Sequence, residues 1–325
     1  MVLAGDIGGT STRLALATVE ERELRLDVVE RYASREHAGL GEIVDAFVAA
    51  HPARIARACF GIAGPVRGGR VETPNLPWVI EAGPLSRRLG GAQVRLLNDL
   101  EANAYGVFTL VAEDFAVLHP GEPAADGNAA ILSPGTGLGE AGYYWDGREL
   151  RPFASEGGHA DFAPRSDLEI ALFSWLRRRF GHVSSERVLS GPGLVNLYTF
   201  LRDTGPGEEP DWLAAEMRAS DPAAAISQAA LAERSPLATG ALDLFVSILG
   251  AEAGNLALKM KATRGIYLGG GIAPKILPRL QRPGFLEAFV DKGRFRAFME
   301  SIPVQVVLNE HTALQGAAWC ASLPA

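Results

Sequence analysis

The sequence predicts an α/β protein of two domains that face each other across a cleft, and three observations support this prediction. The length of 325 residues allows one large domain or two ordinary ones of ~100–200 residues each. Two short apolar runs flank a glycine turn in residues 2–17, and the same pattern returns in residues 129–145. A strand ending in glycines follows each of them, at 60–64 and 268–271. This internal repeat indicates two α/β domains related by duplication.

The first glycine turn is predicted to bind phosphate. It has the sequence Gly5-Asp6-Ile7-Gly8-Gly9-Thr10 and lies between apolar runs that favour strands rather than a Rossmann or P-loop helix. Glycine accepts positive φ and adds no side chain, so the backbone N–H groups can turn inward around an anion. Asp6 is placed to hold a metal ion or its waters, and Thr10 adds a hydroxyl donor. A plain hairpin with a polar turn is the alternative.

Hydrophobic spacing predicts the remaining elements. Further strands are expected at residues 23–33, 56–62, 94–97, 129–132, 141–145, 266–268 and 304–308. Helices are expected at residues 40–50, 84–89, 100–110, 168–180, 193–201, 222–233, 236–262, 276–280, 285–290, 295–298 and 314–321. Residues 71–78 and 203–210 are rich in Pro, Gly or polar residues and are expected to be loops.

Composition restricts the function classes. The net charge of −7 disfavours nonspecific binding to nucleic acid or to an anionic membrane. The two cysteines, Cys59 and Cys320, lie among apolar residues and are expected to be small buried hydrophobes, which leaves no thiolate zinc site. With a strand expected from residue 2 and no apolar run of about 18 residues, we expect a soluble cytoplasmic protein with no nucleic-acid or membrane partner.

Asn98 and Asp99 stand where a predicted strand ends and a predicted helix begins. Ligands in α/β folds gather at the carboxyl ends of strands. Asp99 is therefore a candidate general base toward a hydroxyl group that Asn98 would orient. Helix capping, which both residue types favour, is the alternative interpretation.

Other polar residues are candidate sugar ligands. Residues 155–161 place Glu156 and His159 around a Gly-Gly turn, and together a carboxylate and an imidazole can accept from and donate to vicinal hydroxyls. Glu186 offers a further carboxylate, and Asn75 lies in a proline-framed loop. The alternatives are a polar turn for the first stretch, a helix start for Glu186 and an ordinary turn residue for Asn75.

A third glycine stretch, Gly269-Gly270-Gly271, follows a predicted buried strand. Glycines there permit close approach of a planar group such as adenine, although a tight strand-to-helix turn explains them equally well. The chain has no Gly-x-Ser-x-Gly elbow and no Walker lysine after a glycine loop, which disfavours hydrolase and P-loop functions.

Together these stretches resemble the bacterial glucokinase family of the actin-like, sugar-kinase and Hsp70 ATPase superfamily. The residues that carry the resemblance stand in family order over nearly the whole chain. They are Gly5 to Thr10, Leu97-Asn98-Asp99, Gly135-Thr136-Gly137-Leu138-Gly139, Glu156 to Pro164, His182 to Gly193, and Gly269 to Ile272. The two long central motifs are highly specific.

The resemblance implies a two-domain actin-like ATPase (ribonuclease H-like) fold and transfer of phosphate from ATP, with Mg²⁺, to the 6-hydroxyl of glucose. It implies Asp99 as the base, and Asn75, Asn98, Glu156, His159 and Glu186 as sugar ligands. The implied nucleotide site consists of Gly5, Asp6, Ile7, Gly8, Gly9, Thr10, Gly135, Thr136, Gly137, Gly269, Gly270 and Gly271, with Asp6 holding Mg²⁺. It also implies a homodimer. The small domain would comprise residues 1–110 and about 310–325, and the large domain residues 111–309.

The chain departs from the family pattern at two places. Ser11 and Thr12 replace the Asn-Ala often seen after the first Gly-Gly-Thr, and Ser133-Pro134 replaces a Gly-Ala before the second glycine turn. Pro134 removes one backbone N–H from that turn. The phosphate donor, which could also be ADP or polyphosphate, therefore stays open, as does the choice among glucose and related hexoses.

Two other function classes compete with a kinase. A sugar-binding regulator without catalysis would be expected to carry a helix-turn-helix extension or a basic patch, and neither is expected here. A chaperone-like ATPase would need a peptide-binding domain as well, for which 325 residues leave little room.

Overall fold

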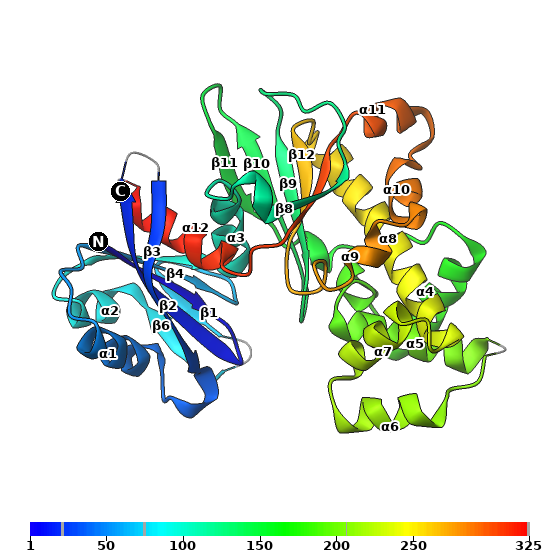
Figure 1. Cartoon of the computed structure of the whole chain (residues 1–325), viewed down its shortest axis with the longest axis horizontal. Helices are drawn as coiled ribbons and strands as arrows, with labels where there is room; N and C mark the ends of the chain where they lie inside the picture. The colour runs from blue at the N-terminus through cyan, green and yellow to red at the C-terminus, as the bar shows by residue number, and fades with distance from the viewer. Residues whose placement is uncertain (21–22, 74–75, 206, 324–325) are drawn as a thin grey trace. The chain divides into compact units, whose positions relative to one another are not determined.

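Two β-sheets organise the chain, one in each of two structural units. The computed structural model describes residues 1–20, 23–73, 76–205 and 207–323. Unit 1 comprises Met1–Asp114, Pro152–Ala154 and Asn309–Ala325, and unit 2 comprises Phe115–Arg151 and Ser155–Leu308. The C-terminal segment thus belongs to the same unit as the N-terminus, and Figure 1 shows helix α12 beside the strands of that unit.

The main sheet of unit 1 has the strand order β3-β2-β1-β4-β7. Its strands are β1 (Val2–Ile7), β2 (Ser11–Glu20), β3 (Glu23–Ala33), β4 (Arg57–Ile62) and β7 (Gln93–Asn98). The pairs β1–β2 and β2–β3 are antiparallel, whereas β1–β4 and β4–β7 are parallel. The other elements are β5 (Arg70–Glu72), β6 (Val79–Glu81), α1 (Leu40–Ala50), α2 (Ala82–Arg88), α3 (Asp99–Val107), α12 (Thr312–Ser322) and the 3₁₀ turns Ser34–Glu36 and Ala112–Asp114.

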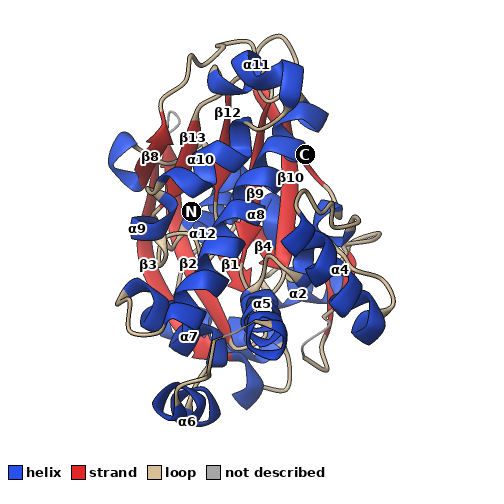
Figure 2. Cartoon of the chain, turned by 90° about the vertical axis from the view of Figure 1, so that its right-hand side faces the viewer, coloured by secondary structure: helices blue, strands red, loops and turns tan. Residues whose placement is uncertain are grey.

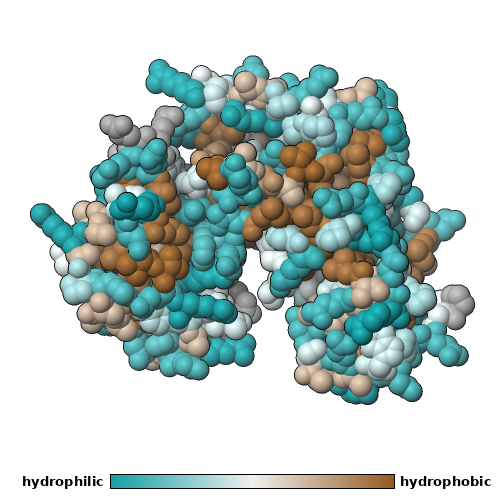
Figure 3. Space-filling model, viewed as in Figure 1, coloured by the Kyte–Doolittle hydropathy of each residue, from teal (hydrophilic) through white to brown (hydrophobic). Residues whose placement is uncertain are grey.

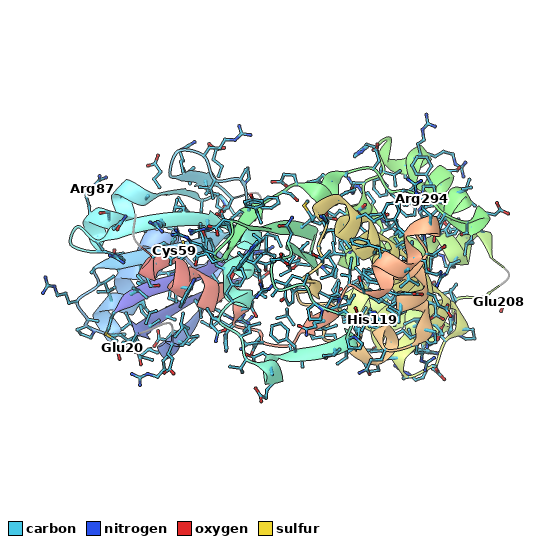
Figure 4. All side chains as sticks on the ribbon, turned by 90° about the horizontal axis from the view of Figure 1, so that it is seen from above. Glu20, Cys59, Arg87, His119, Glu208 and Arg294 are labelled. Carbon is cyan, nitrogen blue, oxygen red and sulfur yellow. The ribbon has the colours of Figure 1, made fainter. Side chains whose placement is uncertain are left out.

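Alternation along the strands of unit 1 builds two cores, one on each face of the sheet. Leu3 and Ile7 of β1 pack with Phe47 of α1, whereas Ala4 packs with the helices on the opposite face. The small residues on that second face allow α12 to lie close to the strands. Its core contains Ala4, Ala15, Ala17, Cys59, Leu97, Ala102, Ala313, Leu314, Ala317, Ala318, Cys320 and Ala321. Cys59, which Figure 4 labels beside α12, is buried and free, as is Cys320, so both cysteines are the small buried residues predicted.

Two glycines bring α3 and α12 into backbone contact. A Cβ atom added to Gly106 of α3 would collide with the carbonyl oxygen of Thr312, and one added to Gly316 of α12 would collide with the carbonyl oxygen of Ala102. The helices therefore approach more closely than any side chain at either position would allow. This contact fixes the C-terminal helix of unit 1 against the helix that begins at Asp99.

Unit 2 is built around a six-stranded sheet of order β11-β10-β9-β12-β13-β8, in which the last three residues of β11, Pro152–Ala154, belong to unit 1. Figure 2 labels β8, β9, β10, β12 and β13 of this sheet. Its strands are β8 (Phe115–His119), β9 (Ala129–Pro134), β10 (Leu138–Trp145), β11 (Leu150–Ala154), β12 (Gly265–Leu268) and β13 (Val304–Val307). Its helices are α4 (Asp167–Phe180), α5 (Gly191–Thr204), α6 (Asp211–Ala219), α7 (Pro222–Leu231), α8 (Pro236–Met260), α9 (Leu277–Leu280), α10 (Pro283–Val290) and α11 (Arg296–Glu300), with 3₁₀ turns at Gly157–His159, Ser185–Arg187 and Gly293–Phe295.

Helix α8 forms the centre of the hydrophobic core in unit 2. Its 25 residues are long and apolar enough to cross a membrane by length and composition alone, which differs from the expectation of no such run. However, 78% of its most apolar window is buried against the rest of unit 2, as in the core helix of a globular unit. On the face drawn in Figure 3, exposed residues are largely hydrophilic and the hydrophobic ones form separate patches.

The structure contains elements that the sequence patterns did not indicate. Strand β5 includes the first two residues of the predicted loop 71–78, where that prediction is wrong, and β6 follows the loop. The short strands β8 and β11 were not predicted. Helix α6 follows the predicted loop at 203–210 and was also missed. Most residues of β8 and β11 are partly or fully exposed, so their apolar alternation is weak.

Substituting Gly316 tests the α3–α12 contact. Gly316→Ala should lower the free energy of unfolding by about 3 kcal/mol, because the added methyl group must displace backbone atoms that cannot rotate away. Thermal and urea unfolding followed by circular dichroism measure the effect. The matched control is Gly284→Ala, a helical glycine whose added Cβ meets nothing within 4 Å. Equal unfolding free energies for the two variants would contradict the close packing.

Candidate functional site

Ser34 holds the first glycine turn in place through two hydrogen bonds. Its hydroxyl donates to the carbonyl oxygen of Gly8 at 2.8 Å, and its backbone N–H donates to the carbonyl oxygen of Thr10 at 3.1 Å. The buried hydroxyls of Ser34 and Thr12 lie 3.0 Å apart and form a hydrogen bond. The turn closes through the Gly8 N–H and the Ser11 carbonyl oxygen at 3.0 Å. Thr12, one of the two departures from the family pattern, therefore belongs to the support of this turn.

The other residues predicted for this turn occupy different environments. Gly5 lies inside β1, where an added Cβ would collide with the Phe60 ring, so close core packing explains this glycine. The Ile7 side chain is 2% exposed and belongs to the hydrophobic core. Gly9 is partly exposed and Thr10 is exposed.

Asp6 presents a partly exposed carboxylate beside the turn. The Arg13 guanidinium lies nearby, with Nη1 3.8 Å from Asp6 Oδ2, and Arg13 also contacts Glu310. Burial raises the pKa of Asp6, and the positive charges of Arg13 and His311 oppose that rise. No sequence pattern indicates Arg13 or His311, because their proximity to Asp6 depends on the β1–β2 pairing and on the chain after β13.

The structure gives Asn98 a capping role. Its Oδ1 accepts from the Leu100 N–H at 2.8 Å and caps α3, and its Nδ2 donates to the Gly64 carbonyl oxygen at 3.1 Å. These bonds fix the orientation of the amide and still leave one N–H of Nδ2 for another acceptor. Asp99 Oδ1 accepts from the same Leu100 N–H at 2.9 Å, and its side chain is partly exposed. Capping and ligand binding are therefore compatible here.

The parallel strands bring the two halves of the unit 1 site to one sheet edge. Ile7 at the end of β1 aligns with Ile62 at the end of β4, which aligns with Asn98 at the end of β7. The first glycine turn and the Asn98–Asp99 pair therefore lie at the same carboxyl edge, one strand apart. This is the edge at which ligands bind in α/β folds.

In unit 2, Glu186 is hydrogen-bonded to the residue that follows the second glycine turn, Gly135-Thr136-Gly137. The Leu138 N–H donates to Glu186 Oε2 at 3.0 Å, and the Gly191 N–H donates to the Gly135 carbonyl oxygen at 2.8 Å. Within the turn, the Gly135 N–H donates to the Gly137 carbonyl oxygen at 2.8 Å. The predicted sugar ligand Glu186 and the predicted phosphate turn, in which Thr136 is exposed, are thus adjacent.

Glu156 and His159 project from a 3₁₀ turn that lies against strand β10, which begins at Leu138. Their side chains are largely exposed, 72% and 61%, and His159 Nε2 lies 4.0 Å from Glu156 Oε2. An added Cβ on Gly158 would collide with the Leu138 carbonyl oxygen, so the turn lies directly against the start of β10. The Ser185 N–H also donates to the Ala160 carbonyl oxygen at 2.9 Å. The structure therefore brings Glu156, His159 and Glu186 together in unit 2.

The third glycine stretch lies against the second. The Gly269 N–H donates to the Leu132 carbonyl oxygen at 2.9 Å, and the Ile272 N–H donates to that of Pro134 at 3.3 Å. Gly270 has a φ of 75°, and an added Cβ there would lie 2.5 Å from the Pro134 carbonyl oxygen. Gly271 is open, with nothing within 4 Å of an added Cβ. Pro134, which cannot donate a hydrogen bond, thus serves as an acceptor for this stretch.

The remaining predicted features are the sugar ligand Asn75 and the Mg²⁺ ligand Asp6. Asn75 lies outside the described residues. Among the described residues, no group of three or more His, Cys, Asp or Glu side chains could hold a metal ion. Asp6 alone still suits Mg²⁺, which prefers oxygen ligands and usually takes one or two carboxylates together with water and substrate phosphates.

Comparisons with known proteins agree along the whole chain. A sequence model of the family described as Glucokinase matches residues 3–323. A protein of Synechocystis sp. named Glucokinase is 43% identical over 345 aligned positions, which cover 98% of this chain and 97% of the relative.

Solved structures show the same similarity. The crystal structure of a glucokinase from an Antarctic psychrotroph superposes with a TM-score of 0.86 at 31% identity and covers 98% of both chains. A ROK family glucokinase from Streptomyces griseus in complex with glucose and AMPPNP has a TM-score of 0.63 at 22% identity, again covering 98% of both chains, and shows the fold alone. These neighbours have the two-domain actin-like ATPase fold, which confirms the predicted fold class.

The support of the first turn can be tested without a ligand. Ser34→Ala removes the hydroxyl that bonds both Gly8 and Thr12, and it should lower the free energy of unfolding by about 1–3 kcal/mol because the Thr12 hydroxyl stays buried without its partner. In a double-mutant cycle with Thr12→Val, urea unfolding should give a coupling of about 1 kcal/mol. Ser174→Ala, which removes a hydroxyl bonded only to its own helix, is the control. Strictly additive effects would contradict the Thr12–Ser34 bond.

Proposed function

Because this chain belongs to the glucokinase family, we propose that it transfers the γ-phosphoryl group of ATP to the 6-hydroxyl of glucose, yielding glucose 6-phosphate and ADP. The observation that carries the proposal is the shared carboxyl edge of β1, β4 and β7, because it aligns a glycine turn with a candidate base. The similarity to the Synechocystis relative, which extends over 97% of that protein, supports the proposal.

Asp99 is the proposed general base. As the oxygen of the glucose 6-hydroxyl attacks the γ-phosphorus, the Asp99 carboxylate accepts the proton of that hydroxyl. The bond between the γ-phosphorus and the β–γ bridging oxygen breaks, and that oxygen leaves with ADP. The Leu100 N–H holds one carboxylate oxygen, which limits rotation of the side chain. Asn98, fixed by its bonds to Leu100 and Gly64, orients the same hydroxyl with its remaining N–H.

Glu156, His159, Glu186 and Asn75 are the proposed further sugar ligands. Two carboxylates and an imidazole can accept from and donate to the remaining hydroxyls of a hexose. Glu186 keeps its second oxygen for the sugar while Oε2 accepts from Leu138. Glu186 and the turn that carries Glu156 and His159 both contact the start of β10, which supports a fixed geometry for these three residues.

The glycine turns at residues 8–10, 135–137 and 269–271 are the proposed nucleotide site. Their backbone N–H groups suit phosphate oxygens, and the open surface at Gly271 suits a planar base. Mg²⁺, when bound, would neutralise charge on the phosphates, with Asp6 holding it directly or through water. Arg13, 3.8 Å from Asp6, keeps that carboxylate in place and adds positive charge nearby.

We further propose that the protein works in the cytoplasm as a homodimer in glycolysis. The family resemblance supports this part of the proposal. Light scattering on the purified protein tests the dimer, since a mass near that of one chain, 34.5 kDa, would contradict it.

Replacing Asp99 separates catalysis from binding. Asp99→Asn keeps the size and the acceptor for the Leu100 N–H but cannot take a proton, so turnover should fall about 10²- to 10⁴-fold while glucose affinity is retained. ADP formation from ATP, Mg²⁺ and glucose measures turnover, and calorimetry measures binding.

The matched control is Glu101→Gln, which removes a carboxylate from the first turn of the same helix. Near-normal turnover by Asp99→Asn would remove the proposed base. An absence of glucose-dependent ADP formation by the unmodified protein would contradict the proposed function itself.

A further inference from the structure

A buried carboxyl group lies directly beneath the turn that carries Glu156 and His159. Glu140 of β10 is 2% exposed, and its Oε1 has no hydrogen-bond partner among the described residues. Its Oε2 lies against Gly157, where an added Cβ would collide with it. None of the motifs in the sequence includes Glu140, and the proposed mechanism does not use it.

The hydrogen-bond donors next to Glu140 are already engaged in shaping the turn. The Gly157 N–H donates to the Ser155 hydroxyl at 3.2 Å, and that hydroxyl donates to the backbone carbonyl oxygen of Glu140 at 3.0 Å. A neutral Glu140 carries no charge and needs fewer donors than the ionised form. An ionised Glu140 would need several, because a buried carboxylate without partners is strongly destabilised. The nearest donors it could recruit are those that define the turn.

The charges that act on Glu140 come from helix α8. They are Glu252, which is also buried, and Lys259, whose Nζ is 3.6 Å from Glu252 Oε1. Lys292, after α10, donates to Asn255 at 2.8 Å and to the Ala251 carbonyl oxygen at 3.0 Å. Both lysines thus contact α8 groups, while the charged side chains of the turn point to solvent.

We propose that Glu140 is a positioning residue whose neutral form keeps the Glu156–His159 turn in its sugar-binding shape, so that affinity for the sugar falls when Glu140 ionises. This inference rests on the proposed function of Glu156 and His159. Ionisation draws the Gly157 N–H and the Ser155 hydroxyl toward the carboxylate and displaces the turn.

The protonation equilibrium of Glu140 places this change near neutral pH. Burial, and secondarily the charge of Glu252, raise the pKa of Glu140 to about 7, while Lys259 opposes the rise. Because the pKa in the folded protein exceeds the ordinary value of 4.5, the folded state binds this proton more tightly than the unfolded state does. Stability therefore declines as pH rises from about 4.5 through 7.

The test compares the pH dependence of glucose binding in the intact protein and in Glu140→Gln. Calorimetry between pH 5.5 and pH 9 should show the dissociation constant of the unmodified protein rising about tenfold, the change for one pKa unit of difference between free and sugar-bound protein. The Gln side chain is neutral at every pH, so this rise should be absent. Any pH dependence that does not involve Glu140 appears in both proteins and cancels in the comparison.

Glu252→Gln supplies a second, independent readout. Removing the negative charge beside Glu140 should move the midpoint of the affinity change to lower pH, which a purely structural role for Glu140 does not predict. Melting curves of Glu140→Gln should show a gain in melting temperature over the unmodified protein that grows between pH 4.5 and pH 8.

The outcomes distinguish the inference from the function on which it rests. The same pH dependence of glucose binding in the unmodified protein and in Glu140→Gln would overturn the role of Glu140 and leave the kinase proposal standing. An absence of glucose binding by the unmodified protein at every pH would overturn both.

Discussion

Parallel pairing of β1, β4 and β7 is the constraint on which the chemistry in unit 1 depends. Because the register aligns Ile7, Ile62 and Asn98, the glycine turn after β1 and the acid after β7 share one sheet edge. Each side chain there is held by local bonds: Ser34 fixes the turn, and Leu100 fixes Asn98 and Asp99. The packing of α12 on α3 through Gly106 and Gly316 supports the helix that starts at Asp99.

In unit 2 a single stretch of strand has the corresponding role. At the start of β10, the Leu138 N–H donates to Glu186, and the Leu138 carbonyl oxygen lies close to Gly158. Glu140 follows two residues later on the same strand. The second glycine turn precedes the same stretch. The proposed phosphate contacts and the proposed sugar contacts in unit 2 therefore depend on the same stretch of β10.

The sequence predicted the parts that depend on local patterns. Short apolar runs identified β1, β2, β4, β7, β9, β10, β12 and β13, and a strand with a polar edge was predicted where β3 lies. Helical spacing identified helices such as α1, α4 and α8. It missed β8 and β11, whose residues are mostly half-buried or exposed, and it could not identify Ser34, Arg13 or Glu140. These three act through partners distant along the chain, such as Gly8 for Ser34 and Gly157 for Glu140. Only the tertiary structure shows such pairs.

A crystal structure of the protein with glucose and a non-hydrolysable ATP analogue tests the central claim most directly. The account predicts one glucose molecule whose 6-hydroxyl oxygen lies about 2.6–3.2 Å from the Asp99 carboxylate while Glu156, His159 and Glu186 contact its other hydroxyls. The analogue phosphates should lie on the glycine turns. A bound glucose with Asp99 turned away from its 6-hydroxyl, or phosphates remote from the turns, would contradict it.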